Sequence, residues 1–303
     1  MTKDFPKISA QQLFCVLFLS RLAVEIITPN TSTAPRETVL AIIITELARF
    51  LLALPLIIFS FKHDNFHRYV YKKSKVWGYI SAAVAALLLI GAAVKTLFHT
   101  SGFAEKNLLV NGGTWLIFAI AAIFAVYAAF MGVEALARSG VLFLVAAGII
   151  TAAVFLADIP YFKTSDVWKI TDAGTLFDDI ITRFFTGGDY LIFAALLPYV
   201  NKKTSASSGK AALIFALMST ILPIIIALMN FLILREFYGL AEYPSAASAS
   251  LSDISLFKRL DGIFSAVWTL CAAFRSGLML LSSVLVFLSL KRVSAQEKAA
   301  ADS

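Results

Sequence analysis

Long apolar runs separated by short polar segments follow one another along almost the whole chain. A helix needs about 20 apolar residues to cross the hydrocarbon core of a bilayer, and most of these runs reach that length. No soluble domain or Gly/Ser linker interrupts them, so the pattern predicts a single membrane domain over residues 1–303 with eight spans. The spans are expected at residues 9–29, 38–61, 77–98, 113–133, 139–158, 186–200, 211–234 and 260–290.

The sixth and eighth runs depart from the usual length. Residues 186–200 are short for a full crossing, but the preceding segment FDDIITRFF, from Phe177, is amphipathic and is expected at the membrane interface. The eighth run, residues 260–290, would extend for about 46 Å at 1.5 Å per residue. It is therefore expected to tilt or to protrude from the bilayer.

The sixth run also holds the most unusual polar residues of the chain. It reads TGGDYLIFAALLPYVN from Thr186 to Asn201, and so places Gly187, Gly188 and Asp189 inside an apolar segment. The backbone groups that a glycine pair frees are tolerated at membrane depth only where protein or a watery cavity receives them. An ionisable residue at this depth indicates function. We therefore expect a helix break at residues 186–189 that forms a site.

Composition and charge support a membrane protein. Hydrophobic residues make up 59% of the 303 residues and charged residues 15%, which is more apolar surface than a soluble fold of this size buries. The net charge of +7 comes from Lys and Arg in short loops, which offer no folded basic face to nucleic acid. The loops after the second, sixth and eighth spans are basic, whereas the loop after the fifth is acidic. The positive-inside rule then places both termini in the cytoplasm.

A weak internal repeat relates the first and sixth spans. Ser20 and Arg21 interrupt the first run, and Pro29 follows nine residues after Ser20. Asp189 interrupts the sixth run, and Pro198 follows nine residues after it. Corresponding breaks in two halves are typical of a transporter binding site.

Most other intramembrane charges lie in pairs at helical spacing, which lowers the cost of insertion without requiring a function. The pairs are Arg21 with Glu25, Glu46 with Arg49, and Glu134 with Arg138. Arg275 has no acid nearby in its own span. It therefore either meets a carboxylate on another helix or marks the point where the long eighth helix leaves the lipid.

Asp189 is the strongest functional candidate because it coincides with the expected break. The N-terminus of a half-helix offers N–H groups that suit a carboxylate, and freed carbonyl groups suit an ammonium group or a cation. This chemistry fits a free amino acid. We expect Asp189 to face Arg21 across the two breaks.

The sequence gives little support to an enzyme. His63 and His67 are four residues apart, but they lie in a Lys-rich segment with no Glu arranged as in a metalloprotease, so a solvated loop is expected. Cys15 and Cys271 fall within spans and are expected to be packed apolar side chains. No nucleotide-binding signature is present. We expect no catalytic residues, no cofactor and no metal.

Four short motifs are distributed over nearly the whole chain. They read KISAQQLFCVLFLSRL at residues 7–22, GVEALAR at 132–138, GGDYLIFAALLPYVNKK at 187–203 and KRLDGIFSAVWTL at 258–270. In this order and spacing they resemble the spore germination permease family. These proteins are the B subunits of spore germinant receptors, a branch of the amino acid–polyamine–organocation transporter superfamily.

The resemblance implies an all-α polytopic membrane protein with the inverted-repeat, LeuT-like transporter fold. That pattern has ten spans, of which the first and sixth are unwound around an amino acid-like ligand. With about eight spans, this chain would lack the last two helices. The residues that match the ligand site are Ser20, Arg21 and Leu22 at the first break, Thr186, Gly187, Gly188 and Asp189 at the second, and Asp261 and Trp268 on the eighth helix.

The resemblance also implies an A subunit and a lipoprotein C subunit as partners, in the spore inner membrane. We therefore expect a multi-pass subunit that binds a small nutrient, above all an amino acid, and triggers spore germination. One alternative is a secondary amino acid permease coupled to ions or protons, with Asp189 and Glu25 as carriers. Another is a non-transporting, truncated assembly subunit. Nucleic acid is not expected as a partner.

Overall fold

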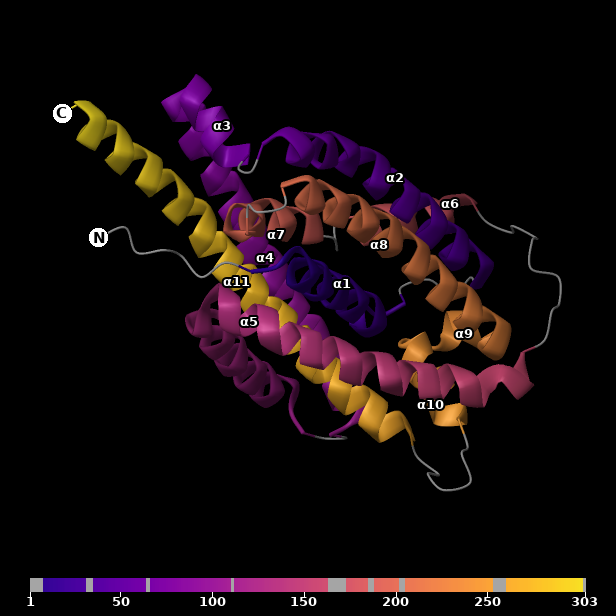
Figure 1. Cartoon of the computed structure of the whole chain (residues 1–303). Coiled ribbons are helices and arrows are strands. Elements are labelled where there is room, and N and C mark those ends of the chain that lie inside the picture. The colour runs from indigo at the N-terminus through magenta and orange to yellow at the C-terminus, as the bar shows by residue number, and fades with distance from the viewer. Residues whose placement is uncertain are drawn as a thin grey trace.

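The computed structural model describes residues 8–30, 35–63, 66–109, 112–162, 173–184, 188–201, 205–252 and 260–301. Within these ranges the chain is helical apart from its connections and an isolated parallel bridge between Ile8 and Val200. Figure 1 shows the helices gathered into one bundle. They are α1 (Ala10–Ile27), α2 (Pro35–Lys62), α3 (Phe66–Lys73), α4 (Lys75–Asn107), α5 (Thr114–Asp158), α6 (Ala173–Phe184), α7 (Asp189–Leu196), α8 (Ser205–Leu234), α9 (Phe237–Leu240), α10 (Pro244–Leu251) and α11 (Leu260–Ala301), with the short 3₁₀ turns η1 (Ile159–Tyr161) and η2 (Leu197–Tyr199).

Six helices in the described part of the chain are long and apolar enough to cross a membrane, namely α1, α2, α4, α5, α8 and α11. The protein is therefore an all-α, polytopic membrane protein, with two spans fewer by this criterion than the eight predicted. Two regions account for the difference. The spans predicted at 113–133 and 139–158 are the two limbs of α5, and the span predicted at 186–200 contains the short helix α7 with η2.

Helix α5 bends sharply within its length (Figure 1), and its non-helical residue is Gly132. A straight helix of its 45 residues would extend for about 68 Å, more than twice the thickness of a bilayer core. Gly132 has φ +84° and ψ 175°, a conformation that is essentially restricted to glycine. The non-helical residue Gly132 therefore divides α5 into two helical limbs, which correspond to the two predicted spans.

We expect Gly132→Ala to lower the free energy of unfolding by about 1–3 kcal/mol, because alanine is strained in this conformation. Nothing lies within 4 Å of a Cβ built on Gly132 or on Gly148, a helical glycine of the same helix without a positive φ. Gly148→Ala is therefore a matched control that should be neutral or slightly stabilising. Thermal unfolding in detergent measures both variants. Equal effects would contradict a backbone origin.

Helix α11 forms the centre of the bundle. In an apolar stretch of 18 residues within α11, 78% of the residues are buried, compared with 22% in the corresponding stretch of α5. It packs against α1, α4, α5 and α7, and a Cβ added to Gly277 would lie 2.7 Å from the carbonyl oxygen of Ala125 on α5. Since this helix is covered on several sides, a charged side chain at its middle must find its partners within the protein.

The two ends of the bundle differ. The start of α1 and the end of α11 lie at the same end, on the left in Figure 1, and α11 continues beyond the neighbouring helices there. The segment between α8 and α11 is rich in small residues and contains the helix α10. This helix is fixed to the end of α5, because Asp158 accepts hydrogen bonds from Ser248 Oγ at 2.5 Å and Ser252 Oγ at 2.8 Å.

Candidate functional site

A helix break lies in the sixth apolar run, where the glycine pair predicted one. Helix α6 ends at Phe184 and α7 begins at Asp189, with Gly188 as a non-helical N-cap at φ −156° and ψ 0°. Thr186 and Gly187, also predicted at this break, lie outside the described residues. The break separates two helices that follow one another directly in the chain.

Helix α6 is the amphipathic segment that the sequence predicts at the membrane interface. It packs against α2, and its polar residues Asp179 and Arg183 are buried. Asp179 accepts a hydrogen bond from Thr38 Oγ1 of α2 at 3.0 Å, and Arg183 Nη2 donates to Asn30 Oδ1 at 2.9 Å. The polar face of α6 therefore points into the protein, and α6 and α7 are the two parts of one interrupted helix.

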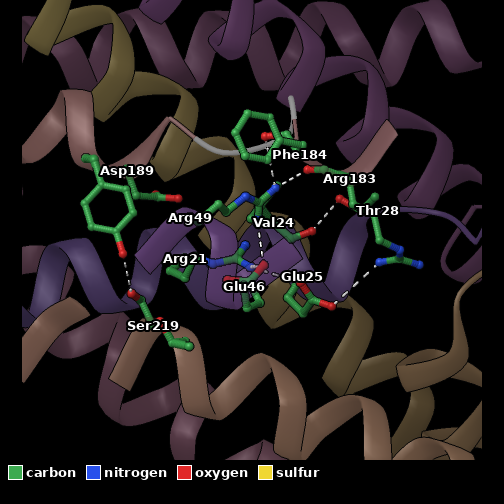
Figure 2. Close-up of polar contacts among 12 residues, drawn as sticks. Arg21, Val24, Glu25, Thr28, Glu46, Arg49, Arg183, Phe184, Asp189 and Ser219 are labelled. Atoms are coloured by element: carbon green, nitrogen blue, oxygen red, sulfur yellow. Dashed lines mark hydrogen bonds and ion pairs between the residues drawn. The ribbon is translucent and has the colours of Figure 1, made fainter. Parts of the chain in front are cut away.

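Side-chain charges match both ends of the break. Arg49 of α2 donates from Nη2 to the carbonyl oxygens of Arg183 and Phe184, the last residues of α6, with 3.4 Å to Phe184 (Figure 2). A cation is favourable at a helix C-terminus, where the last carbonyl groups have no partner within the helix. Asp189 lies in the first turn of α7, where the helix dipole favours an anion. The last two carbonyl groups of α6 are thus satisfied by a protein side chain, as membrane depth requires.

Asp189 connects three helices. It accepts a hydrogen bond from Ser20 Oγ of α1 at 2.7 Å and forms an ion pair with Nη1 of Arg275 on α11. The same Nη1 donates to the carbonyl oxygen of Ser20 at 2.6 Å and to its hydroxyl at 2.7 Å. Arg275 is 0% exposed and Asp189 is 3% exposed. Arg275 therefore meets a carboxylate on another helix, the first of the two possibilities that the sequence left open.

A second buried charge cluster lies beside the break (Figure 2). Glu46 Oε1 accepts hydrogen bonds from Arg21 Nη2 and from Arg49 Nη1, both at 2.5 Å. Glu25 is held more loosely, at 3.4 Å from Arg21 Nη2 and 3.9 Å from Arg183 Nη1. All three pairs predicted from helical spacing are present. Two of them, Arg21 with Glu25 and Glu46 with Arg49, belong to one network that joins α1, α2 and α6, whereas the pair of Glu134 with Arg138 is exposed on α5.

The predicted pairing of Asp189 with Arg21 is wrong. The ion-pair partner of Asp189 is Arg275, whereas Arg21 pairs with Glu25 and Glu46. The neighbouring residue Ser20, rather than Arg21, contacts Asp189. Ser20 and Asp189 are the corresponding polar interruptions of the weak repeat, and these two residues are in contact. The charged residue that we expected opposite Asp189, Arg21, is not its partner.

The predicted break in the first helix is also absent. Helix α1 is a regular helix from Ala10 to Ile27, so Ser20, Arg21 and Leu22 lie within it. Neither glycine nor proline occurs in this helix, and kinks almost always need such a residue or an inserted group. The polar side chains of this segment are satisfied by neighbouring helices and leave the backbone helical. Leu22 packs, partly buried, against the main apolar core.

The two site residues predicted on the eighth helix, Trp268 and Asp261, lie at different distances from Arg275 along α11. Trp268 is 1% exposed and donates from Nε1 to Thr151 Oγ1 of α5 at 3.2 Å. It precedes Arg275 by about 10 Å along α11, whereas Asp261 lies in the first turn, about 21 Å from Arg275 along the axis. Asp261 is therefore far from the break, and Trp268 acts as a packing residue between α11 and α5.

The site predicted from the sequence omitted four residues that carry the charge network. Each is a charge at membrane depth, which is the signal that could have identified it. Pairs at helical spacing offered a simpler explanation for two of them. The omitted residues are Glu46, Arg49, Arg183 and Arg275.

A cavity of about 380 Å³ lies beside the break, between α2 and the ends of α6 and α7. This volume is in the range of small-molecule sites. Two smaller cavities, of about 10 and 20 Å³, share Glu25, Thr28 and Arg183, and each is near the size of one water molecule. The larger cavity is lined by Arg49, Leu52, Ala53, Leu56, Phe184, Gly188, Tyr190 and Leu191.

The histidine, cysteine and acidic side chains are potential metal ligands in the part of the chain that the structure covers. No three His, Cys, Asp or Glu side chains lie together there in a way that could hold a metal ion. His63 is exposed, but His67, predicted in a solvated loop, is buried in α3, with its Nδ1 3.4 Å from Ser81 Oγ. Burial lowers the pKa of His67 to about 4, so this side chain is neutral at physiological pH.

Comparisons with known proteins extend the picture given by the helices and the break. A comparison with curated proteins found no match. A family model described as spore germination protein, the spore permease model, matches residues 7–299. This match covers nearly the whole chain and includes every helix of the bundle except the last residues of α11. The chain therefore belongs to the spore germination permease family and is a germination-related, permease-like membrane protein.

Proposed function

We propose that this protein is the membrane subunit of a spore germinant receptor and binds a small nutrient at the break between α6 and α7. The observation that supports this most is the interrupted helix, which combines a buried carboxylate, matched charges and a cavity of ligand size. Ionisable residues and irregular backbone at membrane depth are expensive and mark binding sites. The nutrient of this proposal is an amino acid.

In this proposal the nutrient signal passes to an A subunit and a lipoprotein C subunit in the spore inner membrane, and both termini face the cytoplasm. The protein is a binding subunit and not an enzyme. The proposal includes the inverted-repeat, LeuT-like fold, with a helix break in the sixth apolar run but none in α1, which is regular. Asp189 of α7 contacts both α1 and α11. A ligand that moves Asp189 would therefore change the packing of these three helices, and this change is the signal.

The alternative of a proton-coupled amino acid permease has one specific observation in its favour. The Glu25 side chain is 12% exposed and lines both of the small polar cavities. A carboxylate between two water-sized cavities is suited to exchanging a proton. Uptake of labelled amino acid that requires a proton gradient and is lost in Glu25→Gln would favour the permease over a receptor that only binds.

Spores of the native host that lack this gene test the proposal. Germination is followed by release of dipicolinic acid across a panel of amino acids and sugars. We expect loss of the response to at least one nutrient, restored by the intact gene and by Glu134→Gln, whose side chain pairs with Arg138 on the exposed surface. An unchanged response to every nutrient in spores that also lack related receptors would refute the receptor role.

Complementation with Asp189→Glu tests the position of the site. This variant keeps a carboxylate for Arg275 but moves it by one methylene, so the subunit should still reach normal levels in spore membranes. We expect the nutrient concentration for half-maximal germination to rise at least about tenfold. A normal response at normal protein levels would show that the nutrient binds elsewhere.

A further inference from the structure

The guanidinium group of Arg275 forms hydrogen bonds from only one of its nitrogen atoms in the described part of the chain. All three of its hydrogen bonds come from Nη1, to Asp189 and to two oxygens of Ser20. Its Nε and Nη2 are buried and have no hydrogen-bond partner among the residues that the structure describes. The side chain is 0% exposed, so bulk water does not reach these donors. Buried charged groups normally have partners for all their donors, and this exception requires an explanation.

The unused atoms are the two that together recognise a carboxylate. The N–H of Nε and one N–H of Nη2 point in parallel from one edge of the planar group and match the two oxygens of a carboxylate. An ordered water molecule would satisfy these donors less completely, because it offers one oxygen. The edge is thus chemically specific for a planar anion.

The charge balance of the site restricts what that anion can belong to. Arg275 is already neutralised by Asp189, which is 3% exposed, so a simple carboxylate would add an uncompensated negative charge to a buried site. A zwitterion adds no net charge. Its carboxylate could pair with Arg275 while its ammonium group pairs with Asp189. Arg275 and Asp189 would then each keep a partner of opposite charge.

We propose that Arg275 binds the carboxylate of the nutrient through Nε and Nη2, and that a zwitterionic amino acid binds by separating the Arg275–Asp189 ion pair. This inference rests on the proposed function. Gly188 lines the cavity of about 380 Å³ and directly precedes Asp189, so a ligand in this cavity lies next to the turn that must move. Because Arg275 also holds the carbonyl oxygen of Ser20, the exchange of partners changes the contacts of α1, α7 and α11 together.

The first test uses spores whose germination depends on the intact gene. They are exposed to L-alanine, L-valine and L-asparagine, to the carboxamide of each, and to the corresponding acid without its amino group, with glucose and fructose as nutrients that lack both charges. We expect a response to an amino acid, and we expect its carboxamide and its deaminated acid to need roughly 100-fold higher concentration or more. A gene-dependent response to a sugar, or to a carboxamide as strong as to its amino acid, would overturn the inference and leave the receptor role intact.

The second test replaces Arg275 with lysine. Lysine keeps the positive charge beside Asp189 but has no pair of parallel donors. We expect Arg275→Lys to reach normal levels in the spore membrane and to lose most of the preference for the amino acid over its carboxamide. A preference equal to that of the wild type would contradict the proposed contact. If lysine prevents accumulation of the protein, the analogue panel on the wild type decides the question alone. If wild-type spores show no response to any nutrient that depends on this gene, the proposed function itself is refuted.

Discussion

Asp189→Asn is expected to lower the free energy of unfolding by about 3–5 kcal/mol, because it leaves Arg275 as a buried cation without a counter-charge. Arg275 is 0% exposed and sits in the centre of the bundle, so the side chain has no route to solvent that keeps α11 in place. Unfolding of the purified protein in detergent, by heat or by sodium dodecyl sulfate, measures the loss.

Two further variants separate charge from other effects. Replacing both partners, as in Asp189→Asn combined with Arg275→Met, should recover most of the stability, because no buried charge remains. Glu134→Gln removes one partner of a pair whose side chains are 70% and 44% exposed, and it should cost less than about 1 kcal/mol. A double variant less stable than Asp189→Asn would contradict this account.

Glu46→Gln is expected to have an effect of similar size, about 3–5 kcal/mol, because one oxygen of Glu46 serves both Arg21 and Arg49. Without this carboxylate, two buried arginines lie close together with less opposing charge. Arg49 also holds the last carbonyl groups of α6, so a shift of its side chain would loosen the end of that helix. The loss is measured by the same unfolding experiments.

Glu25→Gln provides the comparison within the same network. Glu25 lies 3.4 Å from Arg21 Nη2 and 3.9 Å from Arg183 Nη1, and it is 12% exposed toward the small cavities. Its contacts are longer and it is better hydrated, so we expect a smaller loss of about 1–3 kcal/mol. An effect of Glu25→Gln larger than that of Glu46→Gln would show that the shared oxygen is not the centre of the network.

The sequence predicted those features that depend on neighbouring residues. Apolar run length located the membrane helices, and the glycine pair before Asp189 located the break, since both act through the local backbone. The two limbs of α5 were predicted as separate spans, and the non-helical residue Gly132, with φ +84°, lies at the bend between them.

Other features depend on packing between distant segments and could not be read from spacing. Arg275 pairs with Asp189 across 86 residues of sequence, and no local pattern distinguishes it from Arg21 as a partner. The partner of Ser20 in α1 is Arg275 of α11, which a single-segment pattern does not contain. His67 is buried because α3 packs against α4, although its segment is rich in Lys and Arg.

Direct binding of the nutrient to the purified protein tests the central claim, that the ion pair at the α6–α7 break is the nutrient site. The wild type, Asp189→Glu, Arg275→Lys and the surface control Glu134→Gln are placed in lipid nanodiscs, and binding of the radiolabelled amino acid is measured at equilibrium. The account predicts that the two site variants bind at least about tenfold more weakly while the control binds like the wild type. Unchanged binding in both folded site variants would contradict it.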